Sequence, residues 1–489
     1  MKKLFSFLML ATIIATGCDK EKEYSDTLGT GEQTVTPSFV FEEGTYLTPN
    51  VGSDGGALRY NFTTNSTWAV TTSGTWVTIE PASGDATATS FSMIVAKNDT
   101  GRERTAVVRV EYGKNLSLNI TVYQSAELCA TNEVAYKSTN GEVITPTTVE
   151  GFGATFVDNT YADGYGKLRF EGDVKSIPAE AFKGCITLQS IILPDNLEVI
   201  DSYAFEGCRA LDGVTIGDSV TTIGSGAFSG CRALKTAELG EGVTTIGDKA
   251  FYECSQLASI SIPESVNAIG EYTFYNNISL VNVTLGNNLN SIEDHAFAFC
   301  TSLSEITIPE SVKSIEAYAF ADCTSLSKLY LSNSVETIGD HAFTYCTALS
   351  NIQVSTSLKS VGNFSFYRCE KLTSINLGES SLISVGESSF SNCVNLTSIT
   401  LPATITEIGD RVLFGCDKLQ SINCSAVTPP TLGNNAFDTY KIVNIGDNQD
   451  RYDIAAIGAS INVPAESVDT YKSKDGWSNY ASKIVGKDC

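Results

Sequence analysis

A hydrophobic pattern with a period of 23 residues runs through the C-terminal two-thirds of the chain. In the unit that begins at Leu303, the apolar positions follow LxxIxIPxxVxxIxxxAFxxC. Phenylalanine returns at this spacing, with leucine in its place once and two one-residue insertions late in the series: Phe182, Phe205, Phe228, Phe251, Phe274, Phe297, Phe320, Phe343, Phe366, Phe390, Leu413 and Phe437. A fixed period of this length predicts a solenoid, in which each unit buries its apolar side chains against its neighbours.

Each unit is predicted to contain one strand followed by turns. Ile306 and Ile308 place alternate side chains on one face, as a strand requires. Pro309 cannot donate to a sheet ladder and therefore ends that strand. Further along the unit, Val312 and Phe320 are expected to point inward again. A single unit cannot bury these groups alone, so the core must form between stacked units.

This pattern resembles the BspA-like leucine-rich repeats over residues 171–437, as about 12 repeats. The resemblance implies a curved or superhelical solenoid and an association with bacterial surface adhesion. Residues 127–170 lack the repeat and are expected to cap the first coil. Residues 438–489, with Ile461-Asn462-Val463-Pro464, Tyr471 and Trp477, resemble the closing segment of such proteins and are expected to form the C-terminal cap.

The pattern changes over residues 36–126, where short alternating stretches are separated by Gly, Asn, Ser and Asp. The expected strands are 58–62, 68–70, 76–79, 91–95, 106–110 and 116–122. Strands at this spacing favour a small antiparallel β-sandwich. The segment also resembles the BACON family through Trp68, Trp76, Pro81, Gly84, Asn98, Arg104 and Gln124. That resemblance implies an immunoglobulin-like module with a proposed carbohydrate-binding role. We favour core packing over sugar stacking for the two tryptophans.

The first residues are typical of an export signal. Lys2 and Lys3 precede a short apolar run, and the following Ala15-Thr16-Gly17-Cys18 resembles the lipobox of bacterial lipoproteins. We therefore predict a signal peptide over 1–17, lipidation at Cys18 and a flexible tether over 18–35. The alternative is an ordinary signal peptide. The acidic residues 19–23 resemble surface-export signals, so we expect a lipid-anchored, surface-exposed protein of the outer membrane of a Gram-negative bacterium.

Charge narrows the range of partners. The 489 residues carry a net charge of −24, and the sequence holds no basic patch. A chain this acidic repels phosphate backbones, so no nucleic-acid partner is expected. Anionic membrane surfaces are disfavoured for the same reason, which leaves membrane contact only through the N-terminal lipid.

A cysteine follows three residues after most of the repeat phenylalanines. The column is Cys185, Cys208, Cys231, Cys254, Cys300, Cys323, Cys346, Cys369, Cys393 and Cys416, and Asn277 replaces cysteine in one unit. We interpret the column as buried free thiols rather than disulfides or metal ligands, because its side chains all point the same way. The disulfide status of Cys129, Cys424 and Cys489, which lie outside the column, stays open.

Candidate catalytic groups are sparse. The only histidines, His295 and His341, occupy equivalent positions two coils apart, roughly 10 Å from each other, and are expected to face solvent. This separation is too large for a shared metal, and no nucleophile–base pair is evident. We therefore predict no enzyme activity, no metal site and no cofactor.

The positions where the repeats differ are the best candidates for recognition. On each strand, two outward columns carry mostly Ser, Thr, Asn and charged residues, which form a polar sheet face. The candidate ligand-binding residues near its middle are Glu305, Thr307, Lys328, Tyr330, Asn351 and Gln353. The alternative is that such residues simply suit a solvated strand.

These observations favour a cell-surface binding or adhesion lipoprotein. Its repeats would present a recognition face to host or neighbouring-cell proteins or glycans. One alternative is the capture of polysaccharide or mucin through the BACON-like domain. Another is a structural role in the cell envelope.

Overall fold

The structure is a computed structural model. It describes residues 38–41, 47–51, 56–87, 89–96, 98, 104–113, 116–124, 130–162, 164–444 and 450–487. The chain divides into two compact units with a boundary near residue 124, and each unit has its own hydrophobic core. The predicted signal peptide and tether, Cys18, Cys129 and Cys489 lie outside the described residues.

The N-terminal unit is a β-sandwich of two sheets, as the alternating pattern predicts. One sheet has the order β1-β3-β7-β5 and the other β2-β9-β8-β4-β6. The strands are β1 (Phe39–Phe41), β2 (Asn50–Val51), β3 (Gly56–Thr64), β4 (Trp68–Thr72), β5 (Val77–Glu80), β6 (Ser83–Gly84), β7 (Ser90–Val95), β8 (Arg104–Tyr112) and β9 (Leu116–Gln124). All six expected strands are present, and the short β1, β2 and β6 are additional.

The residues that carry the BACON resemblance have structural roles in this sandwich. Trp68 is 3% exposed and stacks edge-on against Phe62 in the core. Gly84 lies under its indole, since a Cβ atom there would come within 2.7 Å of the ring. Arg104 Nε donates a 2.8 Å hydrogen bond to Gln124 Oε1 and thereby ties β8 to β9. The expectation of core packing is confirmed for Trp68, while Trp76 is half-buried at the edge of the core.

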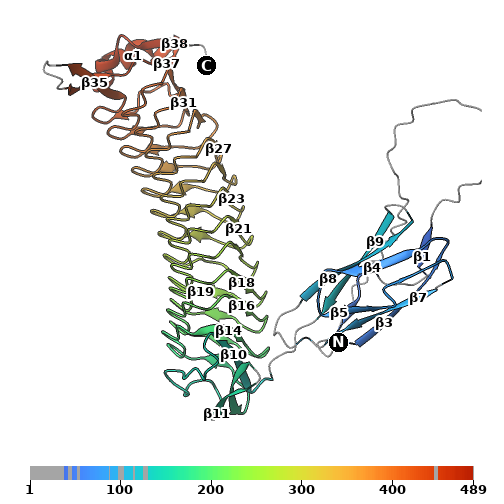
Figure 1. Ribbon diagram of the computed structural model, residues 1–489. Coiled ribbons are helices and arrows are strands. Elements are labelled where there is room, and N and C mark those ends of the chain that lie inside the picture. Colours follow the sequence, from blue (N-terminus) through green and yellow to red (C-terminus); the bar gives the residue numbers. More distant parts are fainter. Residues whose placement is uncertain are drawn as a thin grey trace, which may run out of the picture. The chain divides into compact units, whose positions relative to one another are not determined.

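The C-terminal unit is the predicted solenoid, and Figure 1 shows its coils stacked in succession from β10 to β38. Most coils contribute one longer strand and one strand of two residues. The longer strands are β14 (Leu188–Ile192), β16 (Gly213–Ile216), β18 (Thr236–Leu239), β20 (Ser259–Ser261), β21 (Asn282–Thr284), β23 (Glu305–Thr307), β25 (Lys328–Tyr330), β27 (Asn351–Gln353), β29 (Ser374–Asn376), β31 (Ser398–Leu401) and β33 (Ser421–Cys424).

The two-residue strands form the second stacked side of the solenoid. They are β13 (Ser176–Ile177), β15 (Val199–Ile200), β17 (Thr222–Ile223), β19 (Thr245–Ile246), β22 (Ser291–Ile292), β24 (Ser314–Ile315), β26 (Thr337–Ile338), β28 (Ser360–Val361), β30 (Ser384–Val385), β32 (Glu407–Ile408) and β34 (Thr431–Leu432). Ile269 continues this side through single bridges to Ile246 and Ile292. Within the described residues, twelve coils therefore pair in this way, which agrees with the expected number of repeats.

Neighbouring coils are in parallel register, offset by the repeat length. Glu305 pairs with Lys328, and Lys328 pairs with Asn351. This register stacks the repeat phenylalanines into one buried column, with ring centroids 5.1–5.5 Å apart and interplanar angles of at most 12°. The 23-residue period of the sequence is thus the path length of one coil.

Other elements lie at the two ends of the repeats. At the N-terminal end, the antiparallel sheet β11-β12-β10-β14 combines β10 (Glu133–Ser138), β11 (Thr155–Ala162) and β12 (Tyr165–Glu171) with the first long strand. At the C-terminal end lie β35 (Asp438–Asn444), β36 (Asp450–Ala456), β37 (Ser460–Pro464), the 3-10 helices η1 (Ala465–Ser467) and η2 (Trp477–Tyr480), α1 (Val468–Ser473) and β38 (Ile484–Lys487).

The C-terminal segment covers the apolar end of the last coils. Trp477 and Tyr471 are fully buried in the solenoid core, and their rings meet edge-on at 4.7 Å. Trp477 Nε1 donates a 2.8 Å hydrogen bond to the Pro430 carbonyl, so the indole is anchored as well as packed. Across the residues that the structure describes, no helix is both long enough and apolar enough to cross a membrane.

Candidate functional site

The six residues predicted for ligand binding lie together on three adjacent strands, β23, β25 and β27. Thr307, Tyr330 and Gln353 occupy one register row, in which each pairs with the next. Glu305, Lys328 and Asn351 occupy the other row. All six side chains are exposed, whereas the residues between them point into the core or toward it. We call this surface the strand face.

A shallow cavity of about 530 Å³ lies on the strand face beside Tyr330. Its lining includes Thr307, Gln353 and Ser332, together with Pro309 from the end of β23. Tyr330 is 36% exposed, so its ring presents both an apolar surface and a hydroxyl group to a ligand. The cavity can therefore provide one aromatic anchor and several polar groups.

The charged pair on the strand face is weakly coupled. Lys328 Nζ lies 3.3 Å from Glu305 Oε2, and both side chains are more than half exposed. An ion pair in this setting contributes at most about 1 kcal/mol to stability. Both groups therefore remain available to a partner at little cost to the fold.

The predicted polar columns do not stay exposed along the whole solenoid. Gly213, at the N-terminal end of the column that contains Glu305 and Lys328, is buried. At the other end Ser398, Thr400, Ser421 and Asn423 are only half-exposed. Asn423 accepts a 2.7 Å hydrogen bond from Asn462 Nδ2 of the C-terminal segment, which explains part of this burial. The expected wide polar face is therefore confined mainly to the central coils.

The cysteine column consists of free thiols, as the sequence predicts. Nine of its ten members are buried, and Cys185 in the first unit is half-buried. From Cys208 onward, each thiol donates to the carbonyl of a phenylalanine in the preceding coil at 3.0–3.5 Å. Cys424, outside the column, is also not part of a disulfide, and its thiol lies 3.3 Å from the Tyr471 hydroxyl. These contacts give the cysteines a role in the core.

We expect the column to resist alkylation in the native protein. Burial raises the pKa of Cys300 from its ordinary 9.0 to about 12, so at pH 8 its thiolate fraction is roughly a thousand times lower than that of an ordinary thiol. Labelling with iodoacetamide, quantified for each peptide by mass spectrometry, should be slow for Cys300 and faster for the half-buried Cys185. In urea all column cysteines should react alike. Rapid labelling of Cys300 in the native protein would contradict the expectation.

The histidines occupy equivalent positions, and they are half-buried rather than fully exposed to solvent. His295 stacks between Tyr272 and Tyr318 at centroid distances of 4.4 and 4.6 Å. His341 stacks between Tyr318 and Phe364 at 4.5 and 4.9 Å. This half-buried setting lowers the pKa of both imidazoles, because burial disfavours their charged form. The two rings are separated by a tyrosine, so they do not form a shared metal site.

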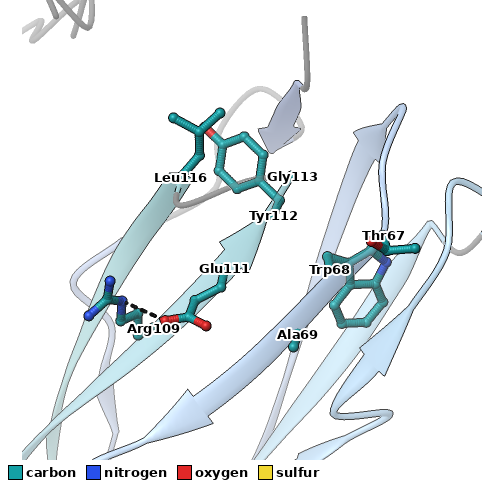
Figure 2. A pocket seen from close by; sticks show the side chains of 8 residues that line it. All are labelled: Thr67, Trp68, Ala69, Arg109, Glu111, Tyr112, Gly113 and Leu116. Atoms are coloured by element: carbon teal, nitrogen blue, oxygen red, sulfur yellow. Dashed lines mark ion pairs between the residues drawn. The ribbon is translucent and has the colours of Figure 1, made fainter.

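The sandwich holds a separate cavity of about 390 Å³ at the ends of β4, β8 and β9. Figure 2 shows Tyr112 and the Arg109–Glu111 ion pair on its lining, with the Trp68 indole nearby. The Nε of Arg109 lies 3.2 Å from Glu111 Oε1. Because the Trp68 ring is buried, it cannot offer an open face for sugar stacking, and the polar lining residues are the groups available to a ligand.

Potential metal ligands are also dispersed. In the described part of the chain, no group of three or more His, Cys, Asp or Glu side chains is placed to hold a metal ion.

The fold and its surfaces define a leucine-rich-repeat solenoid that is preceded by a β-sandwich. The family model of the BspA type leucine rich repeat region matches residues 164–280, 267–381 and 338–454, with six copies of the repeat. Together these matches span more than half of the chain, so the protein belongs to this family. The model of the BACON domain, described as a proposed N-terminal binding domain, matches residues 52–125.

Several solved structures are similar to this chain. A leucine-rich repeat protein from Bacteroides ovatus ATCC 8483 is 25% identical, with a TM-score of 0.41, and the match covers 71% of this chain and 99% of that one. A leucine rich cell surface protein from Faecalibacterium prausnitzii A2-165 is 24% identical, with a TM-score of 0.31 and coverages of 60% and 94%. The T. pallidum leucine rich repeat protein is 28% identical, with a TM-score of 0.32 and coverages of 33% and 78%. No curated protein matches the chain.

Proposed function

We propose that this protein is a non-enzymatic binding protein held at the bacterial cell surface, in which the strand face recognises a protein or glycan on a host or neighbouring cell. The observation that carries the proposal is the strand face itself. Tyr330 stands exposed beside a cavity on three strands whose alternate residues form the core. The BACON model is described as a proposed binding domain, and repeat solenoids typically offer extended binding surfaces, which supports the same general role.

The proposed localisation rests on the sequence. The segment before Cys18 resembles a lipoprotein signal, and a lipid on Cys18 would hold the chain to the outer membrane. Replacing Cys18 by alanine should move the protein from the membrane fraction to the soluble fraction. In a separate experiment, protease added to intact cells should cleave the wild-type protein. Full protection of the wild-type protein would contradict surface display.

Replacing Tyr330 by alanine tests the strand face directly. We screen the full-length protein against arrayed glycans and against purified host-matrix proteins, and measure the affinity of each hit by surface plasmon resonance. Truncating a central aromatic anchor is expected to weaken binding at least about tenfold, since such anchors contribute 2 kcal/mol or more. Tyr203→Ala is the matched control, because Tyr203 is 39% exposed and lies outside the strand face. Equal affinities of the Tyr330 variant and the wild type would contradict the proposed site.

Glycan capture by the sandwich is the second candidate, and the cavity beside Tyr112 and Arg109 supports it. Polar and aromatic groups converge there, as they do in many ligand sites. A glycan hit that survives Tyr330→Ala but is lost in Tyr112→Ala would assign recognition to the sandwich. Absence of any ligand for both surfaces would favour a structural role in the cell envelope.

A further inference from the structure

A second surface of the solenoid carries a continuous row of aromatic rings. Tyr272, His295, Tyr318, His341 and Phe364 stack in sequence at centroid distances of 4.4–4.9 Å, with interplanar angles of 3–13°. The row is about 18 Å long, since it contains four such spacings. We call it the aromatic ladder. It belongs to the turns that precede the buried phenylalanines, and it shares no residue with the strand face.

The aromatic ladder forms one side of a groove with a volume of about 560 Å³. The other lining residues are Tyr275, Phe299, Ala321, Asp322, Thr344, Tyr345 and Tyr367. Phe299 and Tyr345 are each 37% exposed, and they occupy the coils directly before and after that of Asp322. The acid is thus flanked by two accessible aromatic rings.

The fold does not require aromatic residues at these positions. Every ladder residue has a φ angle of 53–58°, in the left-handed region. The equivalent positions in the other coils also have positive φ and vary widely in type: Glu180, Tyr203, Gly226, Lys249, Ser388, Arg411 and Asn435. Glycine and asparagine enter this region at less cost than bulky residues. Five consecutive aromatic residues over these coils therefore call for an explanation beyond backbone geometry.

The charge of the groove points to a cationic ligand. Burial keeps the pKa of the two lining histidines below the ordinary value of an imidazole, so both are neutral near pH 7. Asp322 is then the one lining residue that is charged at this pH. Among the described residues, its carboxylate makes no hydrogen bond or ion pair, and burial raises its pKa. A half-buried carboxylate without a partner is stabilised by an incoming positive charge.

The chain itself shows that these rings accept cations. Lys249 Nζ lies 5.4 Å from the centroid of the Tyr272 ring, at the first ring of the ladder. The Arg368 guanidinium lies 5.6 Å from the Tyr345 centroid and 5.8 Å from that of Tyr367. All three distances fall within the range of cation–π attraction. Of the two rings that flank Asp322, Tyr345 already has the Arg368 guanidinium beside it, whereas no such cation contacts Phe299 within the described residues, so the Phe299 side of Asp322 is open to an incoming cation.

We propose that the aromatic groove binds an extended segment of a partner protein that places a lysine or arginine side chain between Phe299 and Tyr345 and against Asp322. An extended chain advances about 3.3 Å per residue, so the length of the ladder accommodates five or six residues. The Asp322 carboxylate pairs with the charged group of the lysine or arginine. The flanking rings contact the alkyl part of that side chain and attract its charge. The faces of the ladder rings are covered by one another, so their edges border the bound segment.

The test uses a blocked seven-residue peptide with a central arginine between glycine and serine residues, and the full-length protein at 150 mM salt. A second peptide contains citrulline, which keeps the shape of arginine without its charge. We expect the arginine peptide to bind, as measured by calorimetry, and the citrulline peptide to bind at least about tenfold more weakly. Equal binding of the two peptides would overturn the proposal.

Variants of the groove separate a specific site from general attraction to an acidic protein. Asp322→Asn should weaken binding about tenfold, which corresponds to one lost charge-assisted contact. Asparagine already occupies the equivalent positions 276 and 392 at positive φ, so this variant and the double variant Phe299→Asn/Tyr345→Asn should fold. The double variant should also lose binding. Glu379→Gln, which changes the net charge equally outside the groove, should bind within twofold of the wild type.

Three outcomes would contradict the proposed groove. Unchanged affinity of the Asp322→Asn variant for the arginine peptide would show that the Asp322 carboxylate does not contact the ligand. An equal loss in Glu379→Gln would show non-specific attraction. Stoichiometric, Asp322-dependent binding of tetramethylammonium with no binding of the arginine peptide would assign the groove to a small organic cation instead of a protein segment.

Discussion

Replacing Phe297 by alanine should cost about 3–5 kcal/mol of folding free energy, the range for a buried aromatic side chain. Phe297 is fully buried and stacks between Phe274 and Phe320 at 5.2 Å on either side. Because each coil contacts only its neighbours, a gap at this point also weakens the coupling between the two halves of the solenoid. Urea unfolding followed by circular dichroism should show a lower midpoint, with either one transition or two separated ones.

Phe299→Ala is the matched control for this effect. It removes the same side chain two residues away, from a position that is 37% exposed, so its cost should stay below about 1 kcal/mol. A Phe297 variant that unfolds at the same urea concentration as the control would show that the phenylalanine column does not hold the coils together.

The core of the solenoid could be predicted from the sequence because every coil repeats the same constraints. Phe320 and Cys323 recur in step with the strand residues, and parallel stacking in register turns such a recurrence into buried columns. The free state of the cysteines followed from the same regularity. The sandwich strands were predictable for a related reason, since the alternation of apolar and polar residues sets which side of a strand is buried.

The aromatic groove was not predicted, although its signal is present in the sequence. Tyr272, His295, Tyr318, His341 and Phe364 are spaced by 23 residues, but they differ in residue type and carry no apolar pattern of their own. Considering the two histidines without the residues between them led to the expectation of solvent exposure. Their half-burial depends on aromatic neighbours in adjacent coils, which are brought together only by the stacking.

The strand face was only partly predictable. The exposure of Lys328 and Tyr330 follows from strand alternation, and both are exposed. The burial at the ends of the polar columns could not be inferred from alternation alone. It depends in part on contacts such as that between Asn423 and Asn462, which lie 39 residues apart.

Replacing Asn277 by cysteine should stabilise the solenoid by about 1–3 kcal/mol, which is the cost of a buried polar group without a partner. Asn277 is fully buried at the one interruption of the cysteine column, and neither its Oδ1 nor its Nδ2 has a hydrogen-bond partner among the described residues. In the next coil, Cys300 donates to the Phe274 carbonyl at 3.2 Å. By the same geometry, the introduced thiol would reach the Phe251 carbonyl, and it would bring no unpaired amide into the core.

The reciprocal change, Cys300→Asn, provides the control for this prediction. It places a buried amide in the next coil and removes the bond to the Phe274 carbonyl, so it should lower the urea midpoint by a comparable amount. A variant Asn277→Cys with an unchanged or lower midpoint would show that the amide is hydrogen-bonded in the native protein. In that case Asn277 would stabilise this coil at least as well as cysteine. The most common residue of the repeat would then not be the most stabilising residue at position 277.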